Sequence, residues 1–135
     1  MRENDSPLLA SLRVEIRNTV GIYCEDPLFR VAILRTLARP GFALDPEAPC
    51  RAGILSLEVD HAILGTSSPA AVQAAAASEF HMQAAYMFDS VADNDSGPDD
   101  GLNPAEKLAI AIALLTYGQA SVYNAAFAEN DDGYE

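Results

Sequence analysis

The sequence predicts an all-α protein folded as a single helical bundle. Three observations support this fold class. Apolar residues recur at three- and four-residue spacing along most of the chain, no stretch alternates polar and apolar residues as a strand does, and cap-then-proline pairs mark helix starts. With 135 residues, half of them hydrophobic, the chain is long enough for one domain with its own core. We therefore expect residues 1–135 to form that domain, with 1–7 and 129–135 frayed.

The first three helices are expected in the N-terminal half. One face of residues 8–23 is apolar and is made by Leu8, Leu9, Leu12, Ile16, Val20 and Tyr23. Asp26-Pro27 is a cap followed by proline at the first helical position, and it opens a second helix that ends near residues 39–41. The segment 39–50, with three prolines, is expected to be a loop. A third helix follows from about Arg51 to Leu64, with Gly65 as its C-cap.

Two longer helices are expected in the C-terminal half. Ser68-Pro69 opens a helix that reaches about Asp93, and its buried stripe is predicted to contain Val72, Ala76, Phe80, Ala84, Met87 and Val91. A capping box at residues 103–106 opens the last helix, which extends to about Phe127. Because this helix is apolar on nearly every side, we expect it to be buried against its own neighbours or against another chain. The short connection predicts that the two helices are antiparallel neighbours at the centre of the bundle.

Composition and charge narrow the function classes. The net charge of −12 argues against nucleic-acid binding, which needs a basic face. Seven of the eight basic residues precede position 52, and the eighth is Lys107. Cys24 and Cys50 are isolated thiols, which favours a reducing compartment. Without a secretion signal or an uninterrupted membrane span, the chain is expected to be cytoplasmic.

Asp89 and Asp93 are the strongest candidates for chemistry. They are four residues apart on a predicted helix and therefore lie on one face, with Glu79, Met82 and Tyr86 expected along the same side. Two such carboxylates suit Mg²⁺, which takes one or two protein carboxylates and fills its other positions with water or phosphate oxygens. A solvated helix end is the alternative, although carboxylates at a helix C-terminus oppose the helix dipole.

A calcium loop is a third interpretation of the acidic segment 93–101, and its pattern fails. Asp93 and Asp95 suit the first two ligand positions of an EF-hand, but Gly97 falls at the third. Pro98 stands where the loop requires glycine, and no glutamate closes it.

The helix that ends at the aspartates resembles a known motif. The segment SPAAVQAAAASEFHMQAAYMFDSVADND is similar to the helix of trans-isoprenyl diphosphate synthases (polyprenyl synthetases) that ends in the first aspartate-rich motif, DDxxD. Glu79, Ala84, Asp89 and Asp93 match that motif helix. PCRAGILSLEVDHAILG precedes it and AIALLTYGQASVY follows it, in the order in which the family has its flanking helices. The likeness covers about residues 40–127.

The departures from the family pattern bear on activity. Ser90 replaces the second aspartate of DDxxD, Phe88 replaces the preceding histidine, and Gln119 replaces the aspartate after Gly118. Of the basic residues that hold diphosphate in the family, only Arg51 remains. The second aspartate-rich motif, which completes the magnesium cluster, is missing. Because ionising an allylic diphosphate needs metals and cations on both sides of the leaving group, we do not expect a monomer to be an efficient prenyltransferase.

The resemblance assigns specific residues to the site. It implies metal ligation of Mg²⁺ by Asp89 and Asp93, and substrate contacts by Arg51, Met82, Tyr86 and Gln119. Met82 and Tyr86 hold positions whose bulk limits product length in the family, which implies a short prenyl chain. We also expect Tyr86, Tyr117 and Tyr123 to lie in the core or to line a cavity.

Three functions remain open at this point. The first is a half-size subunit that binds prenyl diphosphate through Mg²⁺ and needs another chain, which would be a second copy, a separately encoded half or a full-length synthase. The second is a non-catalytic regulatory or scaffolding subunit of a prenyl diphosphate or terpene synthase. The third is an unrelated helical binding module with an acidic loop.

Overall fold

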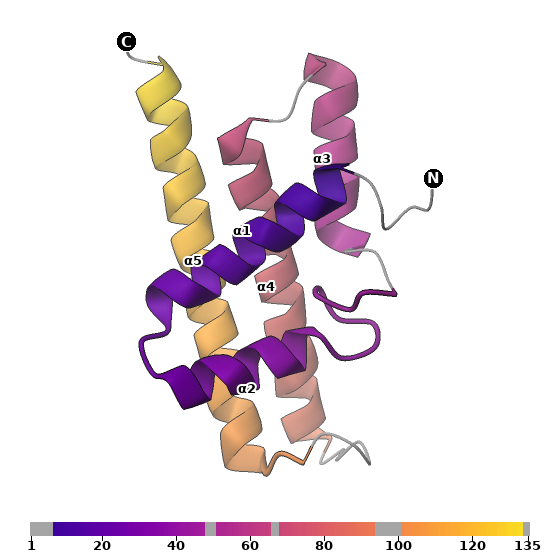
Figure 1. Cartoon of the computed structure of the whole chain (residues 1–135), viewed down its shortest axis with the longest axis vertical. Helices are drawn as coiled ribbons and strands as arrows, with labels where there is room; N and C mark the ends of the chain where they lie inside the picture. The colour runs from indigo at the N-terminus through magenta and orange to yellow at the C-terminus, as the bar shows by residue number, and fades with distance from the viewer. Residues whose placement is uncertain (1–6, 48–50, 66–67, 94–100, 134–135) are drawn as a thin grey trace.

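The structure, a computed structural model, describes residues 7–47, 51–65, 68–93 and 101–133, and every regular element in these ranges is an α-helix (Figure 1). The predicted all-α class is therefore confirmed. The helices are α1 (Pro7–Tyr23), α2 (Pro27–Leu37), α3 (Arg51–Leu64), α4 (Pro69–Ala92) and α5 (Pro104–Gly133).

Local capping bonds explain where α2 and α4 begin. The Asp26 carboxylate accepts hydrogen bonds from the backbone N–H groups of Leu28 and Phe29 at 2.9 and 3.3 Å. The Ser68 hydroxyl caps α4 by accepting from Ala71 N–H at 3.1 Å. These side chains satisfy N–H groups that have no partner inside the helix. The predicted cap-then-proline starts are confirmed at both positions.

The start of α5 and the end of α3 also follow the prediction. Glu106 N–H donates to Asn103 Oδ1 at 2.8 Å, and Asn103 Nδ2 donates back to Glu106 Oε1 at 2.5 Å. Gly65 follows α3 with φ of 78°, a backbone conformation that suits glycine, and its N–H donates to His61 O at 2.8 Å.

The antiparallel pair α4 and α5 forms the long axis of the bundle, and α1 and α2 lie across one face of it (Figure 1). α3 packs beside the N-terminal half of α4, where Gly53 is so close that a Cβ atom would lie 2.9 Å from Ala75 O. The predicted side-by-side packing of α4 and α5 is confirmed by their extensive contact with each other, whereas α5 lies at the edge of the bundle (Figure 1).

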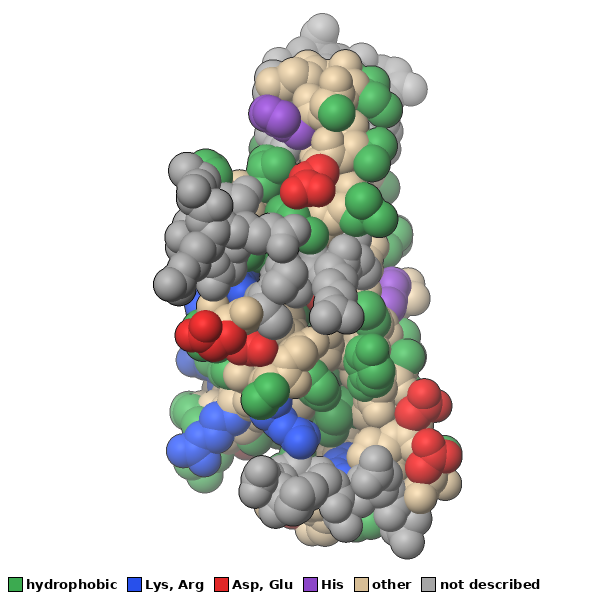
Figure 2. Space-filling model, turned by 90° about the vertical axis from the view of Figure 1, so that its right-hand side faces the viewer, with side chains coloured by type: hydrophobic (Ala, Val, Ile, Leu, Met, Phe, Trp, Pro, Cys, Tyr) green, Lys and Arg blue, Asp and Glu red, His purple; other side chains and the backbone are tan. Residues whose placement is uncertain are grey.

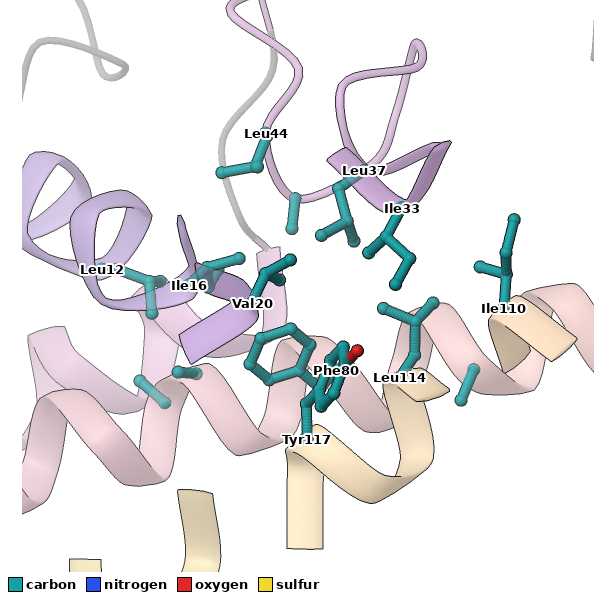
Figure 3. Close-up of a cluster of buried hydrophobic side chains, with 14 of the residues drawn as sticks. Leu12, Ile16, Val20, Ile33, Leu37, Leu44, Phe80, Ile110, Leu114 and Tyr117 are labelled. Carbon is teal, nitrogen blue, oxygen red and sulfur yellow. The ribbon is translucent and has the colours of Figure 1, made fainter. Parts of the chain in front are cut away.

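The core lies between the α1–α2 layer and the α4–α5 pair (Figure 3). Leu57 of α3 extends it, so the largest fully buried apolar side chains come from all five helices: Leu9, Leu12, Ile16, Val20, Ile33, Leu37, Leu57, Phe80, Ile110 and Leu114. The Phe80 ring packs edge-on against Tyr117, with ring centroids 5.9 Å apart. Of the stripe predicted on α4, Ala76, Phe80, Ala84 and Met87 are buried, whereas Val72 and Val91 are half-buried.

Two helices extend beyond their expected ends, and one expectation about side-chain burial was wrong. Helix α5 continues to Gly133, so residues 129–133 prolong the helix, and Pro7 already belongs to α1. No proline or glycine between Phe127 and Gly133 interrupts the helix earlier. Among the tyrosines, Tyr117 is buried as expected, but Tyr86 and Tyr123 are 54% and 67% exposed. Burial of α5 by its own neighbours is incomplete, because α1 and α2 cover only one side of it.

Candidate functional site

One side of α4 is left uncovered by the part of the chain that the structure describes. Its residues recur at three- and four-residue spacing, and none of them is buried: Ala74, Ser78, Met82, Ala85, Asp89 and Asp93. The buried residues of α4, such as Phe80, Ala84 and Met87, lie on other sides of the helix. Since residues at this spacing share one face of a helix, these six form a single stripe.

A matching stripe runs along α5. Its members are all exposed and are separated alternately by three and four residues: Ala105, Leu108, Ile112, Leu115, Gln119, Val122 and Ala126. Leu108, Ile112, Leu115 and Val122 are 40 to 53% exposed. No charged residue occurs between Leu108 and Ala128. Alternating three- and four-residue spacing of apolar residues is the pattern that helices use to pack against a partner helix.

The two stripes adjoin near Gly118 and His81, where α4 and α5 are in close contact. At Gly118 an added Cβ would lie 2.6 Å from the His81 ring, so glycine permits the close approach. The next residue, Gln119, has its side-chain nitrogen 3.5 Å from His81 Nε2. We call the two stripes together the open face. It lies on the side of the helix pair opposite the residues that pack against α1 and α2, such as Phe80 and Tyr117.

The described Lys and Arg side chains lie away from the open face. Figure 2 views the bundle from one side, and the visible Lys and Arg side chains lie at the left and the lower centre, with none along the right-hand edge. Five arginines with described side chains belong to α1, α2 or the turn after α2: Arg13, Arg17, Arg30, Arg35 and Arg39. An anion on the open face therefore meets no Lys or Arg side chain among the described residues.

Asp89 and Asp93 lie one turn apart at the C-terminal end of the open face. Both are exposed, and Asp93 N–H donates to Asp89 O at 2.8 Å, which fixes the helical spacing that the sequence predicts. Within the described residues no group of three or more His, Cys, Asp or Glu side chains is arranged to hold a metal ion. The two carboxylates fit Mg²⁺ in donor type, and they supply only part of its coordination shell.

Ser90, which replaces an aspartate of the family motif, is turned toward α5. Its hydroxyl accepts a hydrogen bond from Lys107 Nζ at 3.1 Å, and Lys107 is buried. The position thus contributes to the contact between α4 and α5. The one basic residue of the C-terminal half is held in that contact and does not reach the open face.

The residues assigned to substrate do not all come together. Met82 and Gln119 lie on the open face. Tyr86 is exposed to one side of it and stacks on Phe42, with ring centroids 6.1 Å apart and planes at 21°. The side chain of Arg51 lies outside the described residues, so its expected role stays a prediction.

Glu79 was expected on the same side as the aspartates, and that expectation was wrong. The Glu79 side chain is 1% exposed, and its carboxylate accepts a hydrogen bond from Gly53 N–H at 2.8 Å. It therefore joins α4 to the first turn of α3, where that N–H has no partner inside the helix. Glu79 matches the glutamate of the family motif in sequence. In this structure it is a buried residue that packs α4 against α3.

The apolar residues of the open face were not singled out from the sequence. The alternating spacing of Leu108, Ile112 and Leu115 was the available signal, but a helix that is apolar all round contains several such stripes. Only the placement of α1, α2 and α4 shows which one is left uncovered.

The same apolarity gives α5 the length and composition of a membrane span. The segment Pro104–Phe127 reaches a mean hydropathy of 1.2, and 33% of it is buried in the bundle. Core helices of globular proteins share these properties. The segment can therefore be interpreted either as a bundle helix or as a membrane helix.

No protein-family model matches the chain, and no curated protein or solved structure matches it. The likeness to trans-isoprenyl diphosphate synthases therefore rests on the three sequence segments and their order.

Proposed function

We propose that this chain is a half-size cytoplasmic subunit of the trans-prenyltransferase type, whose open face is closed by a second chain to form one site for a prenyl diphosphate. One observation carries the proposal: α4 and α5 are covered on one side only. The uncovered side holds four of the six residues that the resemblance assigns to metal or substrate, namely Met82, Asp89, Asp93 and Gln119.

The chemistry of diphosphate departure explains why a second chain is needed. The leaving group carries several negative charges, which metal ions and cationic side chains must neutralise. Asp89 and Asp93 would hold Mg²⁺, and the ion would supply positive charge to the diphosphate oxygens. The described part of the open face adds no Lys or Arg, and Lys107 is engaged with Ser90. The partner must therefore contribute further carboxylates or cations, and the isolated chain is inactive.

A second copy of the chain is the partner that we propose first. The stripe from Leu108 to Val122 is uncharged, whereas the whole chain carries a net charge of −12. Two copies that meet through acidic surfaces repel each other, whereas the α5 stripe itself brings no charged side chain into a contact of α5 with α5. Burial of these apolar side chains then supplies the driving force for association.

The contact between Ser90 and Lys107 favours a second candidate function, a regulatory or scaffolding subunit. The second aspartate of the family motif has become a residue that packs α4 against α5. In this alternative the open face docks onto a complete synthase, and Asp89 and Asp93 hold no metal.

A titration with a short prenyl diphosphate separates the two functions. We expect binding to the wild type to require Mg²⁺, because phosphate oxygens must complete the coordination that two carboxylates begin. Asp89→Asn should remove the metal-dependent part of binding. Glu58→Gln, which neutralises an exposed carboxylate on α3, should leave it unchanged. Calorimetry measures both, and equal heats with and without Mg²⁺ would assign the chain to the regulatory function.

A further inference from the structure

Tyr86 places an aromatic ring beside the proposed metal ligands. It precedes Asp89 by three residues on α4, so their Cα atoms are ~4.5 Å apart along the helix axis and their side chains leave the helix in directions that differ by ~60°. The Tyr86 side chain is 54% exposed. A hydrocarbon chain that starts from a diphosphate at Asp89 and runs along α4 toward Met82 therefore meets this ring within one turn.

Phe42 supports the Tyr86 ring from another part of the chain. It belongs to the turn after α2, and the two rings stack with their centroids 6.1 Å apart and their planes at 21°. Aromatic pairs attract each other in such arrangements at centroid distances of about 4.5–7 Å. The Phe42 side chain is half-buried and packs against the hydrophobic core. The exposed ring of Tyr86 is thus held by a residue that is itself anchored.

The turn that carries Phe42 is fixed by its own hydrogen bonds. Phe42 N–H donates to Arg39 O at 2.9 Å, and Asp45 N–H donates to Phe42 O at 3.0 Å. The Asp45 carboxylate also accepts from Gly41 N–H at 2.8 Å. The Arg39 guanidinium lies 5.6 Å from the centre of the Phe42 ring, within the range of cation–π attraction. Both the backbone and the ring of Phe42 are therefore held in place.

We propose that Phe42 is a positioning residue, which keeps the Tyr86 ring against the hydrocarbon chain of a prenyl diphosphate bound at Asp89. The inference rests on the function proposed for the open face, and it adds a residue that the sequence resemblance does not assign. An apolar chain gains free energy when it leaves water for an aromatic face. A ring that is already held loses less side-chain freedom when the ligand binds. Removal of the Phe42 ring should therefore weaken recognition of the hydrocarbon and leave recognition of the diphosphate unchanged.

Calorimetric titrations with geranyl diphosphate and with inorganic pyrophosphate, both in the presence of Mg²⁺, test this role. The wild type should bind geranyl diphosphate more tightly than pyrophosphate. Phe42→Ala should bind geranyl diphosphate about three- to tenfold more weakly, the range expected for one aromatic contact, and should bind pyrophosphate with unchanged affinity. Phe42→Tyr retains the ring and should behave like the wild type.

Phe29→Ala is the matched control. Phe29 of α2 is likewise half-buried and packed against the core, so both alanine variants lose a core contact. Thermal unfolding should show the loss of stability that they share. Phe29→Ala should nevertheless leave the affinities for both probes unchanged.

A double-mutant cycle shows whether Phe42 acts through Tyr86. Tyr86→Ala should weaken the binding of geranyl diphosphate at least as much as Phe42→Ala does. When Phe42→Ala is added to Tyr86→Ala, the affinity should change no further, because the ring that Phe42 positions is already absent.

The outcomes separate this inference from the proposed function. If neither probe binds in a Mg²⁺-dependent way, the proposed function is wrong and the inference is wrong with it. If Asp89→Asn abolishes binding of both probes but Phe42→Ala weakens both equally or neither, the function stands and the positioning role is overturned. Selective weakening of geranyl diphosphate by Phe29→Ala, or additive effects of Phe42→Ala and Tyr86→Ala, would also overturn that role alone.

Discussion

The two sides of the α4–α5 pair consist of similar residues, but they differ in how far they are buried. On the covered side, Phe80, Ile110 and Leu114 pack against α1 and α2 and are at most 1% exposed. On the open face, Leu108, Ile112 and Leu115 are 40 to 53% exposed. Apolarity alone does not separate the two sides, and the difference arises from what covers them. The covered side stabilises the fold, and the open face is left for another molecule.

Polar side chains also differ between the covered side and the open face. On the covered side, burial together with the nearby Cys24 thiol raises the pKa of Tyr117 to about 12. Glu79 and Lys107 are buried, and each makes a hydrogen bond that joins two helices. On the open face, Asp89 and Asp93 are exposed carboxylates. Polar residues that act in packing are thus separated from those available to a ligand.

The largest expected effect compares one side chain from each side. Phe80→Ala should lower the free energy of unfolding by about 3–5 kcal/mol, because it leaves a cavity in the core. Ile112→Ala on the open face should change it by less than about 1 kcal/mol, because water already reaches that side chain. Urea unfolding at low protein concentration measures both. Similar losses would mean that the open face belongs to the core.

A smaller effect is expected at the contact between the stripes. Gly118→Ala should destabilise the chain, because the new Cβ would lie 2.6 Å from the His81 ring. In a His81→Ala background the same change should become stabilising by about 0.5–1 kcal/mol, the usual advantage of Ala over Gly inside a helix. A double-mutant cycle by thermal unfolding gives the coupling. Additive effects would show that the ring does not pack on Gly118.

The stability of the fold should depend on pH through Asp45. Backbone N–H groups of Gly41 and Glu47 donate to the Asp45 carboxylate at 2.8 and 2.9 Å. These two bonds, with the charge of Arg13 as a smaller cause, hold the pKa of Asp45 below its ordinary value of 3.8. A lowered folded-state pKa contributes stability above the ordinary value, and this stability is lost as pH falls through the lowered one.

Asp45→Asn should therefore be less stable than the wild type at neutral pH, and the two should converge in strong acid. Unfolding curves between neutral pH and strong acid test this, and a parallel offset of Asp45→Asn over the whole range would contradict it.

Local signals explain why the helices were predictable. The caps at Asp26, Ser68 and Asn103 act on the N–H groups of the next few residues, so the sequence contains both partners. The spacing of Asp89 and Asp93 is likewise set by one turn of one helix. The fold class, the helix starts and this part of the candidate site were therefore accessible from the sequence.

The predictions that were wrong depend on contacts between residues that are far apart in the sequence. Whether Glu79 faces solvent depends on α3, whose Gly53 N–H reaches it from 26 positions away. Whether Tyr86 or Leu115 is buried depends on how much of the α4–α5 pair is covered by α1 and α2. The stack of Phe42 on Tyr86 requires the turn after α2 to adjoin α4, which no local pattern specifies. Periodicity shows that a helix has an apolar face, and tertiary packing decides what that face meets.

Sedimentation analysis of the chain tests the central claim, that the open face is an interface, most directly. We expect the wild type to exceed its monomer mass of 14.4 kDa at micromolar concentration. Leu115→Glu should give the monomer with unchanged helicity, because it places a charge in the middle of the uncharged stripe. Val14→Glu, an equivalent change at an exposed residue of α1, should associate like the wild type. A wild type that stays monomeric over this range, or equal dissociation of both variants, would contradict the account.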